Sequence, residues 1–323
     1  MARSALLLAL LAALVAGCDS AADDPFEDQI VVSASLEAEM PLPSVRLTRL
    51  APLFEPYDLA DVAVSGAEVS VSLLGADGSV ERTTPYVEAS AFGLYDPLGN
   101  VPALPGRTYR LEVTGPAGER LSAETTVPPA FRVVEPPPPS VVYGAGQGPS
   151  VRITQTSSAA RRAAFVLTAR ALSPVAFDPV RIDGATRYRS RPESGFLPVP
   201  LVRQIADCED EPAGTLLCDD DPAEDFARGT SPIINEDSYT DLGDGTLRVN
   251  IPFIAFGFYG PQEVAFVSID AALQDFVETQ AIQFNPTTLS PGEIPNVTTN
   301  VEGGLGVFGS FARASVSTAV TER

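Results

Sequence analysis

A mainly β protein with two sandwich-like domains is the fold class that this sequence predicts. Three observations support it. Short runs rich in β-branched residues recur along the chain, clusters of glycine, proline, aspartate and asparagine separate these runs, and one stretch alone has the spacing of an amphipathic helix. The chain has 323 residues, which is long enough for two domains with hydrophobic cores of their own.

Residues 1–17 have the composition of a bacterial lipoprotein signal peptide. Arg3 supplies a positive charge, residues 5–15 are almost continuously apolar, and residues 16–17 are small, as a signal peptidase requires. Cys18 follows at the position where a lipobox places the cysteine that becomes acylated. The alternatives are an ordinary signal peptide with a chance cysteine and a transmembrane helix. The helix is excluded because the apolar run is shorter than the roughly 20 residues that span a bilayer.

Lipid attachment at Cys18 would fix the compartment of the protein. Two or three acyl chains hold a protein on a membrane essentially permanently, whereas one chain binds marginally. We therefore expect an extracytoplasmic lipoprotein that contacts the membrane through its N-terminal lipid, with residues 18–28 as an acidic tether.

Residues 29–135 are predicted to form an immunoglobulin-like sandwich. Asp77-Gly78 is a strong hairpin signal between alternating segments, and Gly93 precedes a further short β-rich segment. The clearest β-rich runs cover residues 29–37, 67–74, 108–114 and 120–127.

A linker and a second β-rich domain are predicted to follow. Residues 136–149 combine four consecutive prolines with spaced glycines, which is typical of a stiff spacer that ends in a flexible turn. The second domain, residues 150–323, has β-rich runs at residues 151–155, 163–172, 247–255 and 263–268.

One amphipathic helix interrupts the second domain. From Ile269 to Ile282 the apolar positions mostly recur three or four residues apart, and Ser268 or Asp270 is placed to cap the first turn. We expect the helix to end before Asn285 because Pro286 disfavours helical geometry in the residue ahead of it. A glycine-rich turn and strand over residues 303–320 then close the chain.

The charge and the missing residue types exclude several classes of function. The chain has 42 acidic residues against 21 basic ones, all of them arginine, and a net charge of -21. Such a charge repels nucleic-acid phosphates, so we expect no nucleic-acid partner. With no histidine and no lysine, a Ser-His-Asp triad and a Ser-Lys dyad are both unavailable. We predict no enzymatic activity, and hydrolysis by paired carboxylates is the one common route left open.

The two remaining cysteines lie in an acidic stretch of the predicted second domain. In an oxidising compartment Cys208 and Cys218 most simply form a disulfide that closes a short loop. The alternative is a reactive or metal-binding pair, which would need further soft ligands. Nearby carboxylates could bind calcium, with Asp219, Asp220 and Asp221 as candidates, but their spacing matches no EF-hand and acidic loops are usually solvated. We expect no cofactor other than such a calcium ion.

Several segments together resemble a known family. They are VSGAEVSV, GLY, PGRTYRLEV, LSAETTVP and the final PNVTTNVEGGLGVFGSF, all after the lipobox cysteine. This succession resembles a family of Bacteroidota lipoproteins known as domain of unknown function DUF4249. The resemblance spans most of the mature chain apart from its middle, and NVEGGLGVFG is its most specific stretch. It implies an outer-membrane or surface lipoprotein, often encoded near TonB-dependent receptors, with a binding or accessory role and no catalytic residues that carry over.

The glycine-rich end of the chain allows two interpretations. Gly303, Gly304 and Gly306 indicate first positive φ angles or close approaches of the backbone, and second a ligand-binding loop. In the second interpretation Asn300 and Phe308 would belong to the same functional loop.

The location within the envelope also depends on the resemblance. Asp19, Asp23 and Asp24 resemble the export signal that sends Bacteroidota lipoproteins to the cell surface, whereas in enterobacteria Asp19 would indicate retention at the inner membrane. We expect an outer-membrane lipoprotein at the cell surface.

Three hypotheses for function follow. The first is a surface binding or accessory module that works beside an outer-membrane TonB-dependent receptor. The second is a structural envelope lipoprotein without a small ligand, and the third is a carboxylate-dependent hydrolase.

Overall fold

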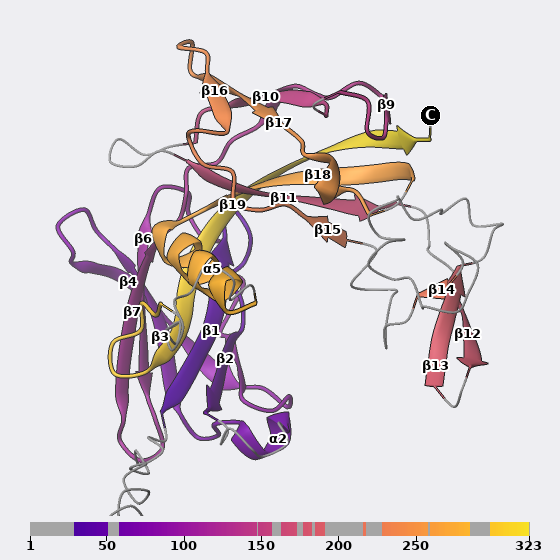
Figure 1. The fold of residues 1–323 in the computed structure, drawn as a ribbon. Coiled ribbons are helices and arrows are strands. Elements are labelled where there is room, and N and C mark those ends of the chain that lie inside the picture. The colour runs from indigo at the N-terminus through magenta and orange to yellow at the C-terminus, as the bar shows by residue number, and fades with distance from the viewer. Residues whose placement is uncertain are drawn as a thin grey trace, which may run out of the picture.

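A computed structural model describes most of the chain, and its secondary structure is mainly β (Figure 1). The mainly β fold class with few helices is therefore confirmed. The described residues are 29–50, 58–146, 148–156, 163–172, 177–182, 185–190, 216–217, 228–257, 259–284 and 298–322.

The first sandwich has two layers of strands around one core. Strand β4 (Val80–Glu88) belongs to both layers, because its first part pairs with β3 (Glu68–Leu74) and its last three residues pair with β5 (Leu94–Pro97). A short helix, α2 (Leu59–Val62), lies beside β2. One layer contains β1 (Ile30–Glu37), β2 (Val45–Arg49) and β5 (Leu94–Pro97), and the other contains β3 (Glu68–Leu74), β6 (Thr108–Thr114) and β7 (Arg120–Thr126).

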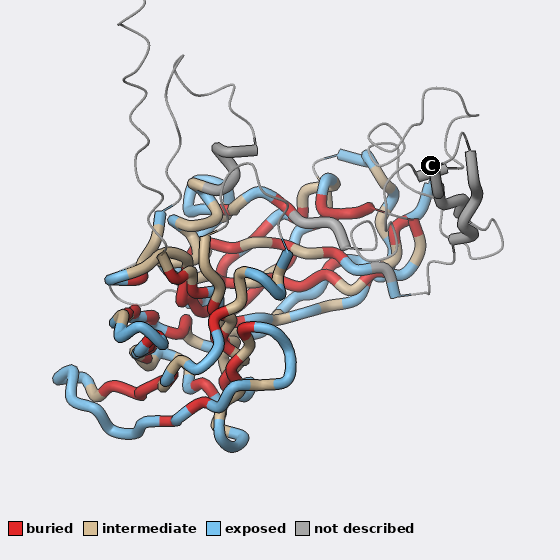
Figure 2. The backbone as a smooth tube through the Cα atoms, turned by 90° about the horizontal axis from the view of Figure 1, so that it is seen from below, coloured by how far each residue is buried: buried red, intermediate tan, exposed pale blue. Residues whose placement is uncertain are grey.

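The alternation predicted for these strands is present. Every second residue of β1, β6 and β7 is buried, and the apolar ones among them meet in one core (Figure 2). Apolar side chains at period two place one face of each strand inward and leave the other in water. The Asp77-Gly78 turn joins β3 to β4 as predicted, with Gly78 at a φ of 78°.

The second sandwich also has two layers. One layer contains β9 (Ser140–Val142), β11 (Ala164–Ala171), β15 (Arg228–Thr230) and β18 (Gly260–Ile269). The other contains β8 (Val133–Glu135), β10 (Ser150–Thr154), β16 (Tyr239–Asp241) and β17 (Thr246–Asn250). Phe165, Phe266 and Ile153 are among the fully buried residues between the layers.

Two smaller elements complete the second half. The run predicted at residues 247–255 is divided into β17 and a 3-10 helix, η2 (Phe253–Ala255), because Pro252 precedes the helix and cannot donate a ladder hydrogen bond. A separate sheet contains β12 (Phe177–Ile182), β13 (Ala185–Ser190) and β14 (Leu216–Leu217).

The last strand, β19 (Leu305–Thr321), runs through both sandwiches. Its first half pairs in parallel with β1, from Leu305 opposite Val31 to Phe311 opposite Glu37. Its second half pairs antiparallel with β18, and it also pairs in parallel with β9. Figure 1 shows this strand in yellow, rising along the first sandwich and ending in the second.

This arrangement differs from the sequence-based division into residues 29–135, 136–149 and 150–323. Val301 and Phe308 are buried in the core of the first sandwich, although they belong to the last part of the chain. The predicted linker contains β9, which pairs in parallel with the end of β19 in the second sandwich. A division by sequence position could not anticipate either feature, because parallel pairing joins segments that are distant in sequence.

The predicted helix is present as α5 (Ala271–Phe284), where the second sandwich meets the first. Asp270 caps it, because its Oδ1 accepts a hydrogen bond from the backbone N–H of Leu273 at 3.0 Å. The capping role predicted for Ser268 or Asp270 therefore belongs to Asp270. Within the described residues, no helix has both the length and the apolarity needed to cross a membrane.

Candidate functional site

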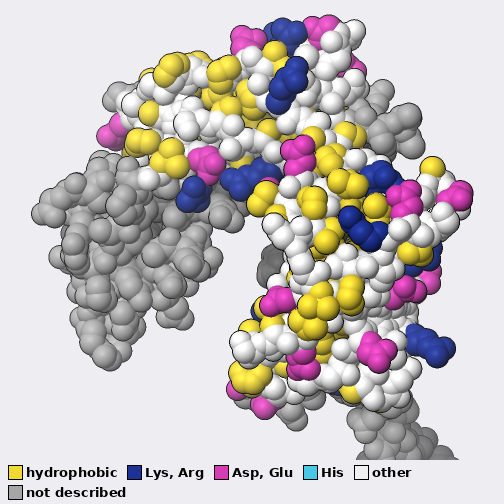
Figure 3. Space-filling model, turned by 180° about the vertical axis from the view of Figure 1, so that it is seen from behind, with side chains coloured by type: hydrophobic (Ala, Val, Ile, Leu, Met, Phe, Trp, Pro, Cys, Tyr) yellow, Lys and Arg dark blue, Asp and Glu magenta, His cyan; other side chains and the backbone are white. Residues whose placement is uncertain are grey.

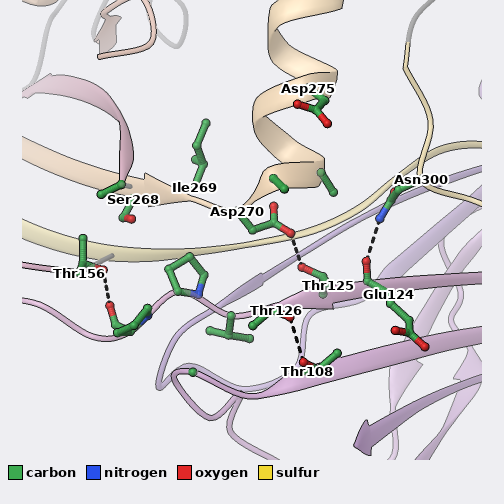
Figure 4. Close-up of a pocket in the computed structure, with 17 residues that line it drawn as sticks. Thr108, Glu124, Thr125, Thr126, Thr156, Ser268, Ile269, Asp270, Asp275 and Asn300 are labelled. Atoms are coloured by element: carbon green, nitrogen blue, oxygen red, sulfur yellow. Dashed lines mark hydrogen bonds between the residues drawn. The ribbon is translucent and has the colours of Figure 1, made fainter. Parts of the chain in front are cut away.

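A pocket of about 470 Å³ lies at the junction of the two sandwiches (Figure 4). We call it the junction pocket. Its walls come from the end of β7 and the Pro-rich segment that follows, from the end of β18, and from the first turn of α5. Val127, Pro128, Ala163, Ile269 and Ala272 make part of its lining apolar, and the side chains of Thr126 and Asp275 add polar groups.

Asp270 connects both sandwiches at the base of this pocket. Its Oδ2 accepts a hydrogen bond from the Thr125 hydroxyl of β7 at 2.6 Å, while its Oδ1 caps α5. Burial raises the pKa of Asp270 above its ordinary value, and the hydrogen bonds from Thr125 and the Leu273 amide oppose that rise. Because both carboxylate oxygens are engaged, Asp270 holds the structure together at this point.

A hydroxyl pair extends the same network to β19. The Oγ atoms of Thr125 and Ser310 are 2.6 Å apart, and the backbone N–H of Asp270 donates to the Ser310 carbonyl at 2.9 Å. Strands β7 and β19 and the start of α5 are therefore joined by buried polar contacts, which fixes the walls of the junction pocket.

A shallow polar surface continues from the pocket along β6 and β7. We call it the edge groove, and its lining includes Arg110, Glu112, Arg120, Ser122 and Glu302. Both the junction pocket and the edge groove are lined by Glu124 and Asn300, so the two are continuous. Arg110 forms a salt bridge with Glu124 at 2.7 Å.

The pattern of charge is local. Figure 3, which views the molecule from behind, shows arginine and acidic side chains interspersed with apolar ones on that face. In contrast, the junction pocket and edge groove together are lined by five carboxylates, Glu112, Glu124, Asp270, Asp275 and Glu302, against the two guanidinium groups of Arg110 and Arg120. The site is therefore acidic.

Comparison with known proteins identifies the family. The family model described as domain of unknown function (DUF4249) matches residues 19–317. The chain belongs to the DUF4249 family. The match includes the middle of the chain, which the sequence resemblance did not cover, and no curated protein matches.

Matches of this DUF4249 protein to solved structures are weak. Salmonella alpha-2-macroglobulin reacted with methylamine is 12% identical with a TM-score of 0.22, and the match covers 91% of this chain but 15% of that one. Trypsin-activated alpha-2-macroglobulin from Escherichia coli is 12% identical with a TM-score of 0.19, covering 76% and 14%. Murine CEACAM1b is 10% identical with a TM-score of 0.16, covering 91% and 100%. These matches say nothing about what the DUF4249 protein binds or does.

Asn300, predicted to belong to a functional loop, clamps the backbone of this DUF4249 protein. Its side-chain amide donates to the carbonyls of Glu124 at 3.0 Å and Phe308 at 2.8 Å, and its Oδ1 accepts from the Phe308 N–H at 3.0 Å. It lines the junction pocket with its amide already hydrogen-bonded.

The three predicted glycines allow close approach of backbones. Gly303 and Gly306 have φ angles of 77° and 100°, and a Cβ atom at Gly306 would lie 2.0 Å from the Val32 carbonyl oxygen. A Cβ at Gly304 would lie 2.3 Å from the Leu121 side chain. These positions therefore fit the first interpretation, in which the glycines provide positive φ angles or close approaches of the backbone. Phe308 is fully buried and belongs to the hydrophobic core.

The other predicted site residues lie outside the described residues. These are Cys18, the cysteines Cys208 and Cys218, and the calcium candidates Asp219, Asp220 and Asp221. In the part of the chain that the structure describes, no group of three or more His, Cys, Asp or Glu side chains is arranged to hold a metal ion.

The residues that sequence reasoning missed are those of the junction pocket. Thr125, Thr126 and Asp275 lie in ordinary β-strand and helix patterns, and nothing in their sequence neighbourhood marks them. One indication of this pocket was present in the sequence, which was the position of Asp270 as a cap of the predicted helix. A residue that caps a helix and also contacts a strand places the first turn of the helix beside that strand.

Proposed function

We propose that this DUF4249 protein is a lipid-anchored outer-membrane lipoprotein at the cell surface, and that it acts as a binding or accessory module. The observation that supports binding is the junction pocket, an acidic and partly apolar concavity of about 470 Å³ whose walls are joined by hydrogen bonds of Thr125 and Asp270. The partner that fits the family resemblance is an outer-membrane TonB-dependent receptor.

The beginning of the fold supports a tethered arrangement. Strand β1 begins at Ile30, only a short acidic segment after Cys18. An extended chain spans at most roughly 3.5 Å per residue, so a tether of this length keeps the first sandwich close to the anchoring membrane. The second sandwich then lies farther out, and the junction pocket lies between them.

The engagement of Asp270 favours binding over hydrolysis. A general acid or nucleophile needs a carboxylate that can reach a substrate, but both oxygens of Asp270 already accept hydrogen bonds from the protein. Asp275 is exposed on α5, and Glu124 is paired with Arg110. A binding role needs no free pair of carboxylates.

Mass spectrometry of the mature protein, together with protease treatment of intact cells, tests the anchor. We expect an acylated N-terminal Cys18 in the wild type, release of a Cys18→Ser variant from membranes, and digestion of the wild-type protein in intact cells. An unmodified mature protein that begins elsewhere would overturn the lipoprotein proposal.

A second experiment separates a receptor-associated module from a structural lipoprotein. Crosslinking in intact cells, with a photoreactive residue in place of Asp275, should give an adduct with an outer-membrane β-barrel protein. The same substitution at Glu278, an exposed position on the same helix that does not line the pocket, is the control. Equal adducts at both positions would favour a structural role without a specific site.

A further inference from the structure

We propose that the junction pocket and the free end of the β7 edge bind an extended, basic segment of a partner protein by strand addition. This inference rests on the proposed binding function and names the chemistry of the partner. Strand addition takes its affinity from main-chain hydrogen bonds and its selectivity from pockets for alternate side chains.

Among the strands that the structure describes, β7 is the last in its sheet. It pairs with β6 on one side, and the order of the described strands ends with it. In an antiparallel ladder, alternate residues direct both their N–H and C=O groups to the same neighbour. The Val127 N–H donates to the Arg107 carbonyl, so the odd-numbered residues of β7 bond to β6 and the even-numbered ones face outward.

The chain itself covers the first part of this outward edge. Ser122 exchanges two backbone hydrogen bonds with Glu302, at 2.8 and 3.1 Å. At the next outward position the Asn300 side chain occupies the carbonyl of Glu124. The segment around Asn300 and Glu302 thus protects the edge against uncontrolled pairing.

Within the described part of the chain, this protection ends where the junction pocket begins. Thr126 is the following outward residue, no described residue hydrogen-bonds to its backbone N–H or C=O, and it lines the pocket together with Glu124. An extended segment placed there would meet the Thr126 backbone on one side. On the other side it would meet Ala271 and Ala272 of α5, which are small enough to leave room for its side chains.

The charges favour a basic segment over an acidic one. The site has five carboxylates and two guanidinium groups, and Arg110 is already paired with Glu124. The start of a helix would ordinarily attract an anion, but the Asp270 carboxylate already caps α5. Among the described residues, none hydrogen-bonds to the Asp275 side chain, which is left to pair with an arginine or lysine of the partner.

Nuclear magnetic resonance of residues 19–323, without the acylated cysteine, tests this inference. The probe is an acetylated and amidated octapeptide that alternates valine and arginine, titrated to millimolar concentration. We expect the amide signals of Glu124 and Thr126 to shift in a saturable manner. An octapeptide with glutamate in place of arginine, and one with N-methyl groups on alternate residues, should bind at least about fivefold more weakly.

Matched variants localise the effect. Thr126→Pro removes the outward N–H without removing a ladder bond to β6, and it should weaken binding about fivefold. Thr126→Ser keeps both the N–H and the hydroxyl that pairs with Thr108, and it should restore binding close to that of the wild type. Asp275→Asn should weaken binding about threefold and Glu278→Gln should not.

No saturable shift at Glu124 and Thr126, or equal binding of the arginine and glutamate peptides, would overturn the inference. These measurements use no membrane and no receptor. If the peptide titration fails and the crosslink at Asp275 succeeds, strand addition is wrong and the proposed function stands. If the peptide binds and no β-barrel protein is crosslinked, the partnership with a receptor is wrong.

Discussion

The two halves of β19 belong to one continuous strand but have different surroundings. The half beside β1 is covered on both faces, with residues 307–310 buried in succession. One face meets the core of the first sandwich through Phe308, and the other meets α5, where a Cβ at Gly309 would lie 2.3 Å from Leu273. The half beside β18 alternates between exposed and more covered residues.

This difference explains the residue types in each half. A strand covered on both faces needs small residues wherever another backbone or a helix comes close, and glycine meets that need at Gly306 and Gly309. A strand with one open face tolerates polar and charged residues at alternate positions, such as Arg313, Ser315 and Ser317. The half beside β1 supports the junction pocket through the contacts of Ser310 with Thr125 and Asp270, and the half beside β18 is more tolerant of substitution.

The largest expected effect is at Gly306. Gly306→Ala would place a Cβ 2.0 Å from the Val32 carbonyl oxygen at a φ of 100°, so we expect the free energy of unfolding to fall by roughly 4 kcal/mol or more. Urea denaturation measures this. Gly66→Ala, at a φ of 76° with open space around its Cβ, is the control and should cost about 1–2 kcal/mol. Equal losses would mean that the close approach to β1 contributes nothing.

Asn300→Ala should have the next largest effect. It would leave the Phe308 N–H, the Phe308 carbonyl and the Glu124 carbonyl without their side-chain partner, which should cost about 2–3 kcal/mol. Asn235→Ala, which removes short-range contacts in an exposed turn, should cost about 1 kcal/mol or less. If thermal denaturation ranks the two variants in the opposite order, the hydrogen bonds of the Asn300 side chain do not stabilise the half of β19 beside β1.

Asp270→Asn should change the pH dependence of stability. The pKa of Asp270 is raised in the folded state, so the folded protein binds this proton more tightly than the unfolded one does. The stability that comes from this bound proton is fully present below the ordinary aspartate pKa. It is lost as the pH rises through the pKa that Asp270 has in the folded protein. Urea midpoints should therefore show wild-type stability falling relative to Asp270→Asn as pH rises above about 4. If the stabilities of the wild type and Asp270→Asn differ by the same amount at every pH, the pKa of Asp270 is not raised by folding.

The smallest effect is expected in the half of β19 beside β18. Arg313 lies 3.4 Å from Glu263, which also pairs with Arg170 at 3.0 Å, and all three side chains are partly exposed. Arg313→Gln should change the free energy of unfolding by less than about 0.5 kcal/mol, since exposed ion pairs contribute little. A loss comparable to that of Asn300→Ala would show that the two halves are not as different as their burial implies.

Much of the fold could be predicted from local patterns in the sequence. Alternation identified β1, β3, β6 and β7, the Asp77-Gly78 turn identified the hairpin, and three-and-four spacing with a capping residue identified α5. These signals are local, because neighbouring residues alone determine the period of a strand or the cap of a helix.

The rest depends on contacts between distant parts of the chain. Pairing of β1 with β19 joins residues 31 and 305, and no local pattern encodes such a partner. The same holds for the junction pocket, which forms because Thr125 and Asp270 meet across 145 positions of sequence. The glycines of the final motif were noticed, but only the positions of Val32 and Leu121 show that close packing explains them.

Amide hydrogen exchange along β19 tests most directly whether this strand joins the two sandwiches into one unit. We predict that residues 306–310 and 314–319 exchange with the same free energy of opening, and that Gly306→Ala lowers both by the same amount. Full protection of residues 314–319 in a variant whose residues 306–310 exchange freely would show two independent sandwiches, and the junction pocket would then have no fixed walls.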